Sequence, residues 1–294
     1  MSGPSPGETG GRAVGESGLM VIVRGGGDVA SAVAHRLFRA AFRVLILEAR
    51  QPATVRRRMA YASAIYEGEV LLEGVRAVRV ADLVEARALL GAHEAIPVLA
   101  DPEGEAIRVL APPAVVDARL QKKERGGSRV TDAPLVVGLG PGFRAGVEAH
   151  RVIETNRGPH LGRIIDEGEA DPYTGEPVEI EGHSRDRYLY APKAGTFRTA
   201  LEIGALVEAG RVIGEVEGIP LKALVRGMIR GIAKDGLAVA AGTKLVDVDP
   251  RAREELVSEL SAKAWTIAES VLRAITTWRF VGSAATRRPG DAGG

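Results

Sequence analysis

The fold is decided by the stretch Leu19-Met-Val-Ile-Val-Arg-Gly-Gly-Gly-Asp-Val-Ala30 and by the residues that follow it. A short apolar run ends at Arg24, a glycine cluster follows, and apolar residues then recur at Val29, Val33 and Leu37. This pattern predicts a strand, a tight turn and a helix. Glycines allow the backbone to turn sharply and to approach a ligand, and the start of the helix offers unpaired N–H groups to an anion.

A second apolar run, residues 43–48, ends in an acid that lies 23 positions after Gly25, since 48 − 25 = 23. Dinucleotide-binding sheets of the Rossmann type combine a G-x-G-x-x-G/A turn with such an acid, which binds the ribose. We therefore predict binding of NAD(P) or another adenine nucleotide. The predicted contacts are Gly25, Gly26, Gly27, Asp28 and Glu48. In the alternative, these small residues only close a strand–helix–strand unit, and the charge of Asp28 would oppose a pyrophosphate beside it.

Further apolar runs at residues 96–100, 114–117 and 135–138 predict more strands of a parallel sheet that is covered on both faces. The last run leads into a second glycine loop. If its strand is parallel to the first, both loops lie at the carboxyl edge of the sheet, where ligands bind in open α/β folds. The second loop adds Gly138, Gly140 and Gly142 to the predicted cofactor site. Asp117, at the end of the preceding strand, is interpreted as either a site acid or a turn residue.

Three arginines lie in or after the second loop, namely Arg144, Arg157 and Arg163. Guanidinium groups bind phosphate with two hydrogen bonds, so we predict that these arginines form an anion pocket facing the first loop. In the alternative, they tie the following segment to the body through nearby carboxylates. Residues 56–58 are also arginines. They are interpreted either as part of an exposed helical face or as a contact for an anion near Glu48. The histidines lack a recognisable ligand motif, so no metal site is predicted.

Residues 195–216 recur as residues 227–248, with every matched pair 32 positions apart. Each copy has the pattern of strand, turn and strand, and two such halves predict a small pseudo-symmetric β-sandwich. The repeat resembles the barrel-sandwich hybrid of biotinyl and lipoyl domains. Those domains carry a modified lysine between their halves, whereas Lys222 lies beyond the corresponding hairpin here. A docking or structural module is the favoured interpretation, and a swinging arm is the alternative.

An apolar stripe after residue 253 predicts a final helix that packs on the body or on a second subunit, so a homo-oligomer through this helix is one interpretation. Altogether we predict an α/β protein with a Rossmann-like parallel sheet, a small module like a barrel-sandwich hybrid, and a C-terminal helix. The predicted parts are a disordered tail at 1–17, a nucleotide-binding domain at 18–150, a linker at 151–186, the β module at 187–250, the helix at 251–281 and a disordered tail at 282–294.

The composition excludes several classes of function. The chain has 294 residues, 45% of them hydrophobic, which is enough for a substantial core. Its formal net charge is +1 without a long basic run, which argues against a nucleic-acid partner. It has 0 cysteines, so disulfides and thiolate catalysis are excluded. No apolar run is long enough to span a membrane, and the expected location is the cytoplasm.

Several segments resemble the YqeB-type family, which comprises accessory proteins of the selenium-dependent molybdenum hydroxylase system. The segments are residues 23–28, 64–70, 138–143, 152–158, 161–163 and 248–251. The resemblance implies an accessory protein that helps to assemble a molybdenum hydroxylase client, with the molybdenum cofactor as a candidate cargo. The chain departs from the family pattern at Pro159 and over residues 268–270.

These observations predict a maturation factor that binds a nucleotide or a pterin phosphate. Two alternatives remain open. One is an NAD(P)-dependent oxidoreductase, although the sequence shows no convincing general-acid pair. The other is a non-catalytic scaffold that docks on a client enzyme.

Overall fold

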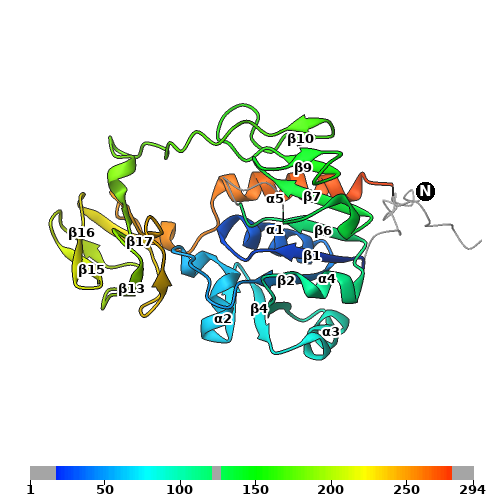
Figure 1. Ribbon diagram of the computed structural model, residues 1–294, viewed down its shortest axis with the longest axis horizontal. Coiled ribbons are helices and arrows are strands. Elements are labelled where there is room, and N and C mark those ends of the chain that lie inside the picture. Colours follow the sequence, from blue (N-terminus) through cyan, green and yellow to red (C-terminus); the bar gives the residue numbers. More distant parts are fainter. Residues whose placement is uncertain (1–17, 121–126, 280–294) are drawn as a thin grey trace, which may run out of the picture.

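The computed structural model describes residues 18–120 and 127–279, and the tails predicted at 1–17 and 282–294 lie outside these ranges. It confirms the mixed α/β class, with one large sheet and additional antiparallel sheets (Figure 1). None of the helices in the described ranges is both long enough and apolar enough to cross a membrane.

The large sheet has nine strands in the order β10-β9-β7-β6-β1-β2-β5-β4-β3. Neighbours from β9 to β4 pair in parallel, whereas β10 and β3 add antiparallel edges. The chain leaves β1 toward β2 on one side and returns to β6 on the other. The strands are β1 (Met20–Arg24), β2 (Arg43–Glu48), β3 (Glu69–Leu72), β4 (Val75–Val80), β5 (Ile96–Ala100), β6 (Ala114–Asp117), β7 (Leu135–Leu139), β9 (Arg151–Ile153) and β10 (Ile164–Ile165).

Both faces of this sheet are buried, as its apolar runs predict. Val21 and Val23 of β1 contribute to the core under α1 (Asp28–Arg39) and α5 (Ala262–Thr276), whereas Ile22 contributes to the core on the opposite face. That second core also contains residues of α3 (Leu83–Ala92) and α4 (Glu105–Leu110), and the short α2 (Ala64–Glu67) joins the first. Alternating strand residues point to opposite faces, which explains why consecutive residues enter different cores.

The C-terminal helix is shorter than predicted. Residues 254–257 form a 3-10 turn, and α5 begins only after Ser261, whose hydroxyl accepts a hydrogen bond from the Ala264 N–H at 3.2 Å. Its apolar stripe is buried against α1 of the same chain. The stripe therefore completes the core of the large sheet.

Residues 188–249 form two four-stranded antiparallel sheets around their own core, at one end of the molecule (Figure 1); we call them the β module. The sequence repeat corresponds to equivalent strands, because β13, β14 and β15 recur as β17, β18 and β19. Pairing is reciprocal: β13 pairs with β18, and β14 with β17. The strands are β12 (Tyr188–Tyr190), β13 (Gly195–Arg198), β14 (Leu206–Val207), β15 (Val212–Val216), β16 (Ile219–Lys222), β17 (Gly227–Ile232), β18 (Ala238–Val239) and β19 (Lys244–Asp249).

Two segments differ from their predicted structure. The predicted linker at 151–186 begins with β9 and β10 of the large sheet, and β11 (Gly168–Glu169) pairs with β8 (Arg144–Ala145). The segment after Pro52, where a helical face at residues 56–58 was one alternative, forms instead a 3-10 turn at Arg57–Met59. The reason lies in the β module, because the Val55 carbonyl accepts a hydrogen bond from the Ile232 N–H at 2.8 Å.

Candidate functional site

The first glycine loop lies at the topological switch point of the large sheet. β1 pairs with β2 on one side and with β6 on the other, so a crevice opens at the carboxyl ends of these strands. Gly25 has φ +96°, and a Cβ there would lie 3.3 Å from the Ala118 carbonyl oxygen. A side chain at Gly26 would meet the Ala62 backbone nitrogen at 2.8 Å, whereas one at Gly27 would meet nothing within 4 Å. Gly27 thus borders open space.

Glu48, predicted to bind a ribose, holds the glycine loop in place. Its Oε2 accepts a hydrogen bond from the Gly26 N–H at 2.6 Å, and its Oε1 accepts one from the Ala49 N–H at 2.6 Å. Burial raises the pKa of the Glu48 carboxyl, and the two N–H donors oppose this effect. The same carboxylate also lines the cavity described next.

A cavity of about 680 Å³ opens in front of the loop. Its volume falls in the range of small-molecule and cofactor sites. Its walls come from the glycine loop, from the segments after β2, β5 and β6, and from one strand of the β module. The lining residues include Gly25, Gly27, Asp28, Glu48, Arg56, Asp101, Pro102, Ala118, Arg119 and Lys244.

Asp28 begins α1, where its charge was predicted to oppose a bound pyrophosphate. The structure places Arg56 against it, with the Nη1 donating to Asp28 Oδ2 at 3.0 Å. Burial alone would raise the pKa of the Asp28 carboxyl, but the Arg56 guanidinium and the Val29 N–H hold it below its ordinary value. The carboxylate is therefore ionised and largely neutralised by Arg56. Of the two alternatives for this arginine, the exposed helical face is excluded.

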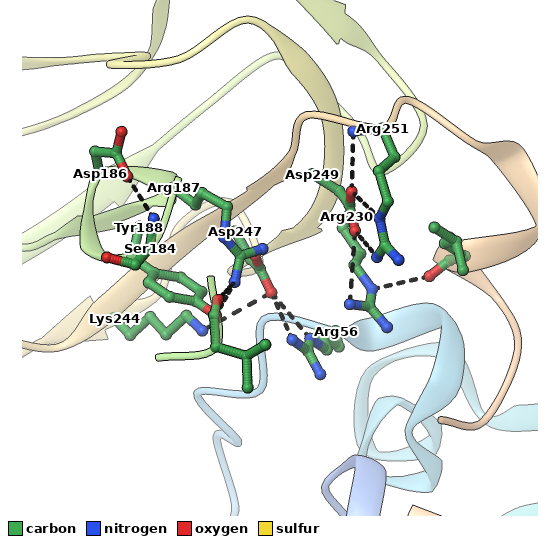
Figure 2. A network of polar contacts seen from close by, with 12 residues as sticks. Arg56, Ser184, Asp186, Arg187, Tyr188, Arg230, Lys244, Asp247, Asp249 and Arg251 are labelled. Carbon is green, nitrogen blue, oxygen red and sulfur yellow. Dashed lines mark hydrogen bonds and ion pairs between the residues drawn. The ribbon is translucent and has the colours of Figure 1, made fainter. Parts of the chain in front are cut away.

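Arg56, which contacts Asp28 at the loop, also contacts Asp247 of the β module, and Figure 2 shows this second contact. Its Nε and Nη2 donate to Asp247 Oδ2 of β19 at 3.0 and 2.8 Å. Asp247 also lies 3.5 Å from Arg187 Nη1 and 3.9 Å from Lys244 Nζ. The side chains of Arg187 and Asp247 are only 2% and 0% exposed. One buried carboxylate thus faces three basic side chains.

The second glycine loop serves the packing of the chain itself. A Cβ at Gly138 would lie 2.3 Å from the Phe143 ring, and one at Gly140 would lie 2.4 Å from the Thr155 hydroxyl. Gly140 and Gly142 have φ of +77° and +104°. The loop does follow a strand parallel to β1 through β6, as predicted. However, its three glycines are not among the residues that line the cavity.

The three arginines predicted to form one pocket lie in different environments. Arg144 donates to Glu169 Oε1 at 2.9 Å and forms an exposed ion pair. Arg163 lines a second, open pocket of about 650 Å³ beside α5. Arg157 is exposed, and partial burial followed by the Arg56 guanidinium lowers its pKa whereas Tyr188 and Asp28 raise it. None of the three arginines is among the residues that line the cavity at the first loop.

Asp117 is a structural residue. Its carboxylate is 1% exposed, and it accepts hydrogen bonds from Arg119 at 3.0 and 2.5 Å and from the Ser128 hydroxyl at 2.7 Å. Arg24 lies 4.0 Å away. These partners fix the ends of β1 and β6 at the floor of the crevice.

Lys244 and Asp247 were not among the site residues predicted from the sequence. In the first copy of the repeat, the corresponding positions hold Val212 and Glu215. The change from an apolar valine to a lysine at equivalent positions of the two copies is the signal that could have pointed to Lys244. Within the described ranges, no group of three or more His, Asp or Glu side chains is placed to hold a metal.

No family model matches the chain. Over 268 residues, or 91% of its length, it is 42% identical to the protein named "Uncharacterized protein YqeB" of Escherichia coli (strain K12). The match covers 49% of that protein, so the chain spans about half the length of this relative.

Two solved structures align weakly. The product-bound ectoine utilization protein EutE (DoeB) of Ruegeria pomeroyi covers 80% of this chain and 86% of its own, at 13% identity and a TM-score of 0.24. A succinylglutamate desuccinylase/aspartoacylase of Rhodobacter sphaeroides covers 79% and 85%, at 14% identity and a TM-score of 0.24. At these TM-scores, neither structure informs the fold or the function of this chain. The similarity to YqeB, in contrast, supports the YqeB-type family that the sequence motifs predict.

Proposed function

We propose that the chain binds an adenine-containing nucleotide, NAD(P) or a related one, in the cavity at the switch point of the large sheet. The observation that carries the proposal is the position of that cavity. It lies between a glycine loop at the start of a 12-residue helix and the acid that ends the next strand. Parallel sheets bind nucleotides at this position, with phosphates at the helix start and the ribose at the acid.

The residues fit such a ligand. Gly27 leaves open space where a backbone N–H group can approach a phosphate, since a Cβ built there would meet no atom within 4 Å. Glu48 faces the cavity with a carboxylate that accepts two N–H bonds and keeps further lone pairs for ribose hydroxyls. A bound dinucleotide would act in hydride transfer or would be the nucleotide part of a larger cofactor.

The wider role that we propose is that of an accessory factor in the maturation of a selenium-dependent molybdenum hydroxylase in the cytoplasm. The YqeB-type motifs support this role, with the molybdenum cofactor as a candidate cargo. We also propose that the β module is a barrel-sandwich hybrid that docks on the client. The reciprocal pairing of its two halves supports this architecture.

Nucleotide binding should stabilise the protein against heat. A ligand that binds only the native state at 100 times its Kd adds about 2.7 kcal/mol. For a protein of this size, that stabilisation raises Tm by roughly 5 °C or more. The measurement is a thermal-shift titration with NAD, NADP, ATP and FAD, with Gly27→Val as the variant that blocks backbone approach. If none of the four shifts Tm at millimolar concentration, the chain is a scaffold without a nucleotide and the proposal fails.

The accessory role has its own test. Deleting the gene should abolish the activity of the molybdenum hydroxylase client while its polypeptide stays at normal abundance, because an immature enzyme still folds without its finished cofactor. The measurement combines client activity with immunoblotting, and re-expression of the intact chain should restore activity. A fully active client in the deletion strain would contradict the maturation role and leave the nucleotide site as a separate question.

A further inference from the structure

Basic side chains from three parts of the chain gather beside the first glycine loop. Arg56 comes from the segment after β2, Arg119 from the segment after β6, and Lys244 from β19. All three line the cavity. Figure 2 shows Lys244 and Arg56 on either side of the Asp247 carboxylate. The β module thus brings a basic group to a cavity whose other walls belong to the large sheet.

Positive charge exceeds negative charge at this place. Arg56, Arg187 and Lys244 all face Asp247, and Asp28 shares Arg56 with it. The lining of the cavity holds four basic side chains and three carboxyl groups, namely Arg24, Arg56, Arg119 and Lys244 with Asp28, Glu48 and Asp101. An anion that enters the cavity would balance this excess of positive charge.

Lys244 is the basic group that the β module contributes to the cavity. Its Nζ lies 3.5 Å from the centre of the Tyr188 ring and 3.9 Å from Asp247 Oδ2, and its side chain is 34% exposed. Burial, together with the Arg56 guanidinium, lowers the pKa of the Lys244 amine to about 8, although Asp247 and Asp28 raise it. A bound phosphate would add negative charge and raise this pKa.

We propose that Lys244 of the β module, together with Arg56, binds the phosphate groups of a nucleoside diphosphate or dinucleotide at the first glycine loop. This inference rests on the proposed nucleotide-binding function and adds its ligand class and the source of the charge. The β module completes the site, so the ligand bridges it to the large sheet. Phosphates that touch Lys244 can then lie beyond Asp28, whose own charge Arg56 neutralises.

Binding of ADP and of adenosine, measured by calorimetry, tests the inference. Lys244→Met keeps the length of the side chain and removes its charge. We expect ADP affinity to fall about 10- to 100-fold, as for loss of a hydrogen bond to a charged group. Adenosine lacks phosphate, so its affinity should stay within about threefold. Lys222→Met is the matched control, because this exposed lysine of β16 lies outside the cavity, and it should leave both affinities unchanged.

A second measurement uses the unaltered protein. An amine-reactive reagent at pH 8, followed by peptide mass spectrometry, should label Lys244, and ADP should protect Lys244 but not Lys222. If ADP binds Lys244→Met as tightly as it binds the wild type, or binds the wild type without protecting Lys244, the inference is overturned and the nucleotide site stays intact. Absence of ADP and adenosine binding to the wild type would overturn both.

Discussion

Asp247→Ala is expected to lower the free energy of unfolding by about 3–5 kcal/mol, because it removes the shared carboxylate of a buried ionic network. The side chains of Asp247 and Arg187 are 0% and 2% exposed, and Arg56 donates two hydrogen bonds to the same carboxylate oxygen. Without that carboxylate, the Arg187 guanidinium stays buried with no opposing charge. A cost of this size is a large part of the total stability of a typical domain.

Urea denaturation followed by circular dichroism measures this cost, and Asp166→Ala is the matched control. Asp166 also accepts a hydrogen bond from an arginine, at 2.8 Å from Arg151 Nε, but its side chain is 65% exposed. Exposed ion pairs contribute about 0–1 kcal/mol, so the control should lose little stability. Equal losses in the two variants would contradict a structural role for the buried network.

The large sheet could be predicted because its signals are local. The run before Gly25 and the run that ends at Glu48 are apolar on both faces, and the helical stripe of α1 lies between them. Each of these elements identifies itself within its own short stretch of sequence, and consecutive strand residues indeed enter cores on opposite faces. The repeat in the β module is likewise visible, since a constant offset between the copies survives substitution of single positions.

The differences arise where distant contacts decide the structure. β9 has 3 residues and β10 has 2, too few for any periodicity to show, and β7 recruits them to the sheet. After Pro52, the bond between Val55 and Ile232 joins the segment to the β module and prevents the predicted helix. Helix propensity is a weak preference that such tertiary contacts routinely override.

Only the part of the candidate site that belongs to the first strand–helix–strand unit could be predicted from the sequence. Gly25 and Glu48 belong to one strand–helix–strand unit, and a known spacing relates them. Lys244 belongs to the β module, far along the chain from Asp28, and no spacing relates residues in different folding units. Arg144, Arg157 and Arg163 are close in sequence, yet Arg144 pairs with Glu169 whereas Arg163 lines the pocket beside α5. Arginines that are close in sequence are thus not necessarily close in the structure.

Gly26→Ala and Gly27→Ala are expected to separate stability from binding within one loop. At Gly26 the added methyl would lie 2.8 Å from the Ala62 nitrogen and 3.1 Å from its Cα, both backbone atoms that cannot move alone. The Gly26 carbonyl also accepts a hydrogen bond from the Ala62 N–H at 2.8 Å, which holds the two segments together. Overpacking of this kind costs about 1–3 kcal/mol, measured as the loss in the free energy of unfolding.

Gly27→Ala adds the same methyl one residue later, where it would meet nothing within 4 Å. Gly27 is the N-cap of α1 with φ −66°, a value that alanine adopts freely. Alanine is a poorer N-cap than glycine, which lowers the free energy of unfolding by about 0.5–1 kcal/mol. Alanine also restricts the unfolded chain, which stabilises the native state by a similar amount. The stability of the ligand-free protein should therefore hardly change. The methyl instead occupies space that the proposed phosphate needs, and ADP affinity should fall by about tenfold or more. If Gly27→Ala binds ADP as tightly as the wild type does, the phosphate does not lie against this loop. If Gly26→Ala is as stable as Gly27→Ala, the packing of Gly26 on Ala62 does not constrain the loop.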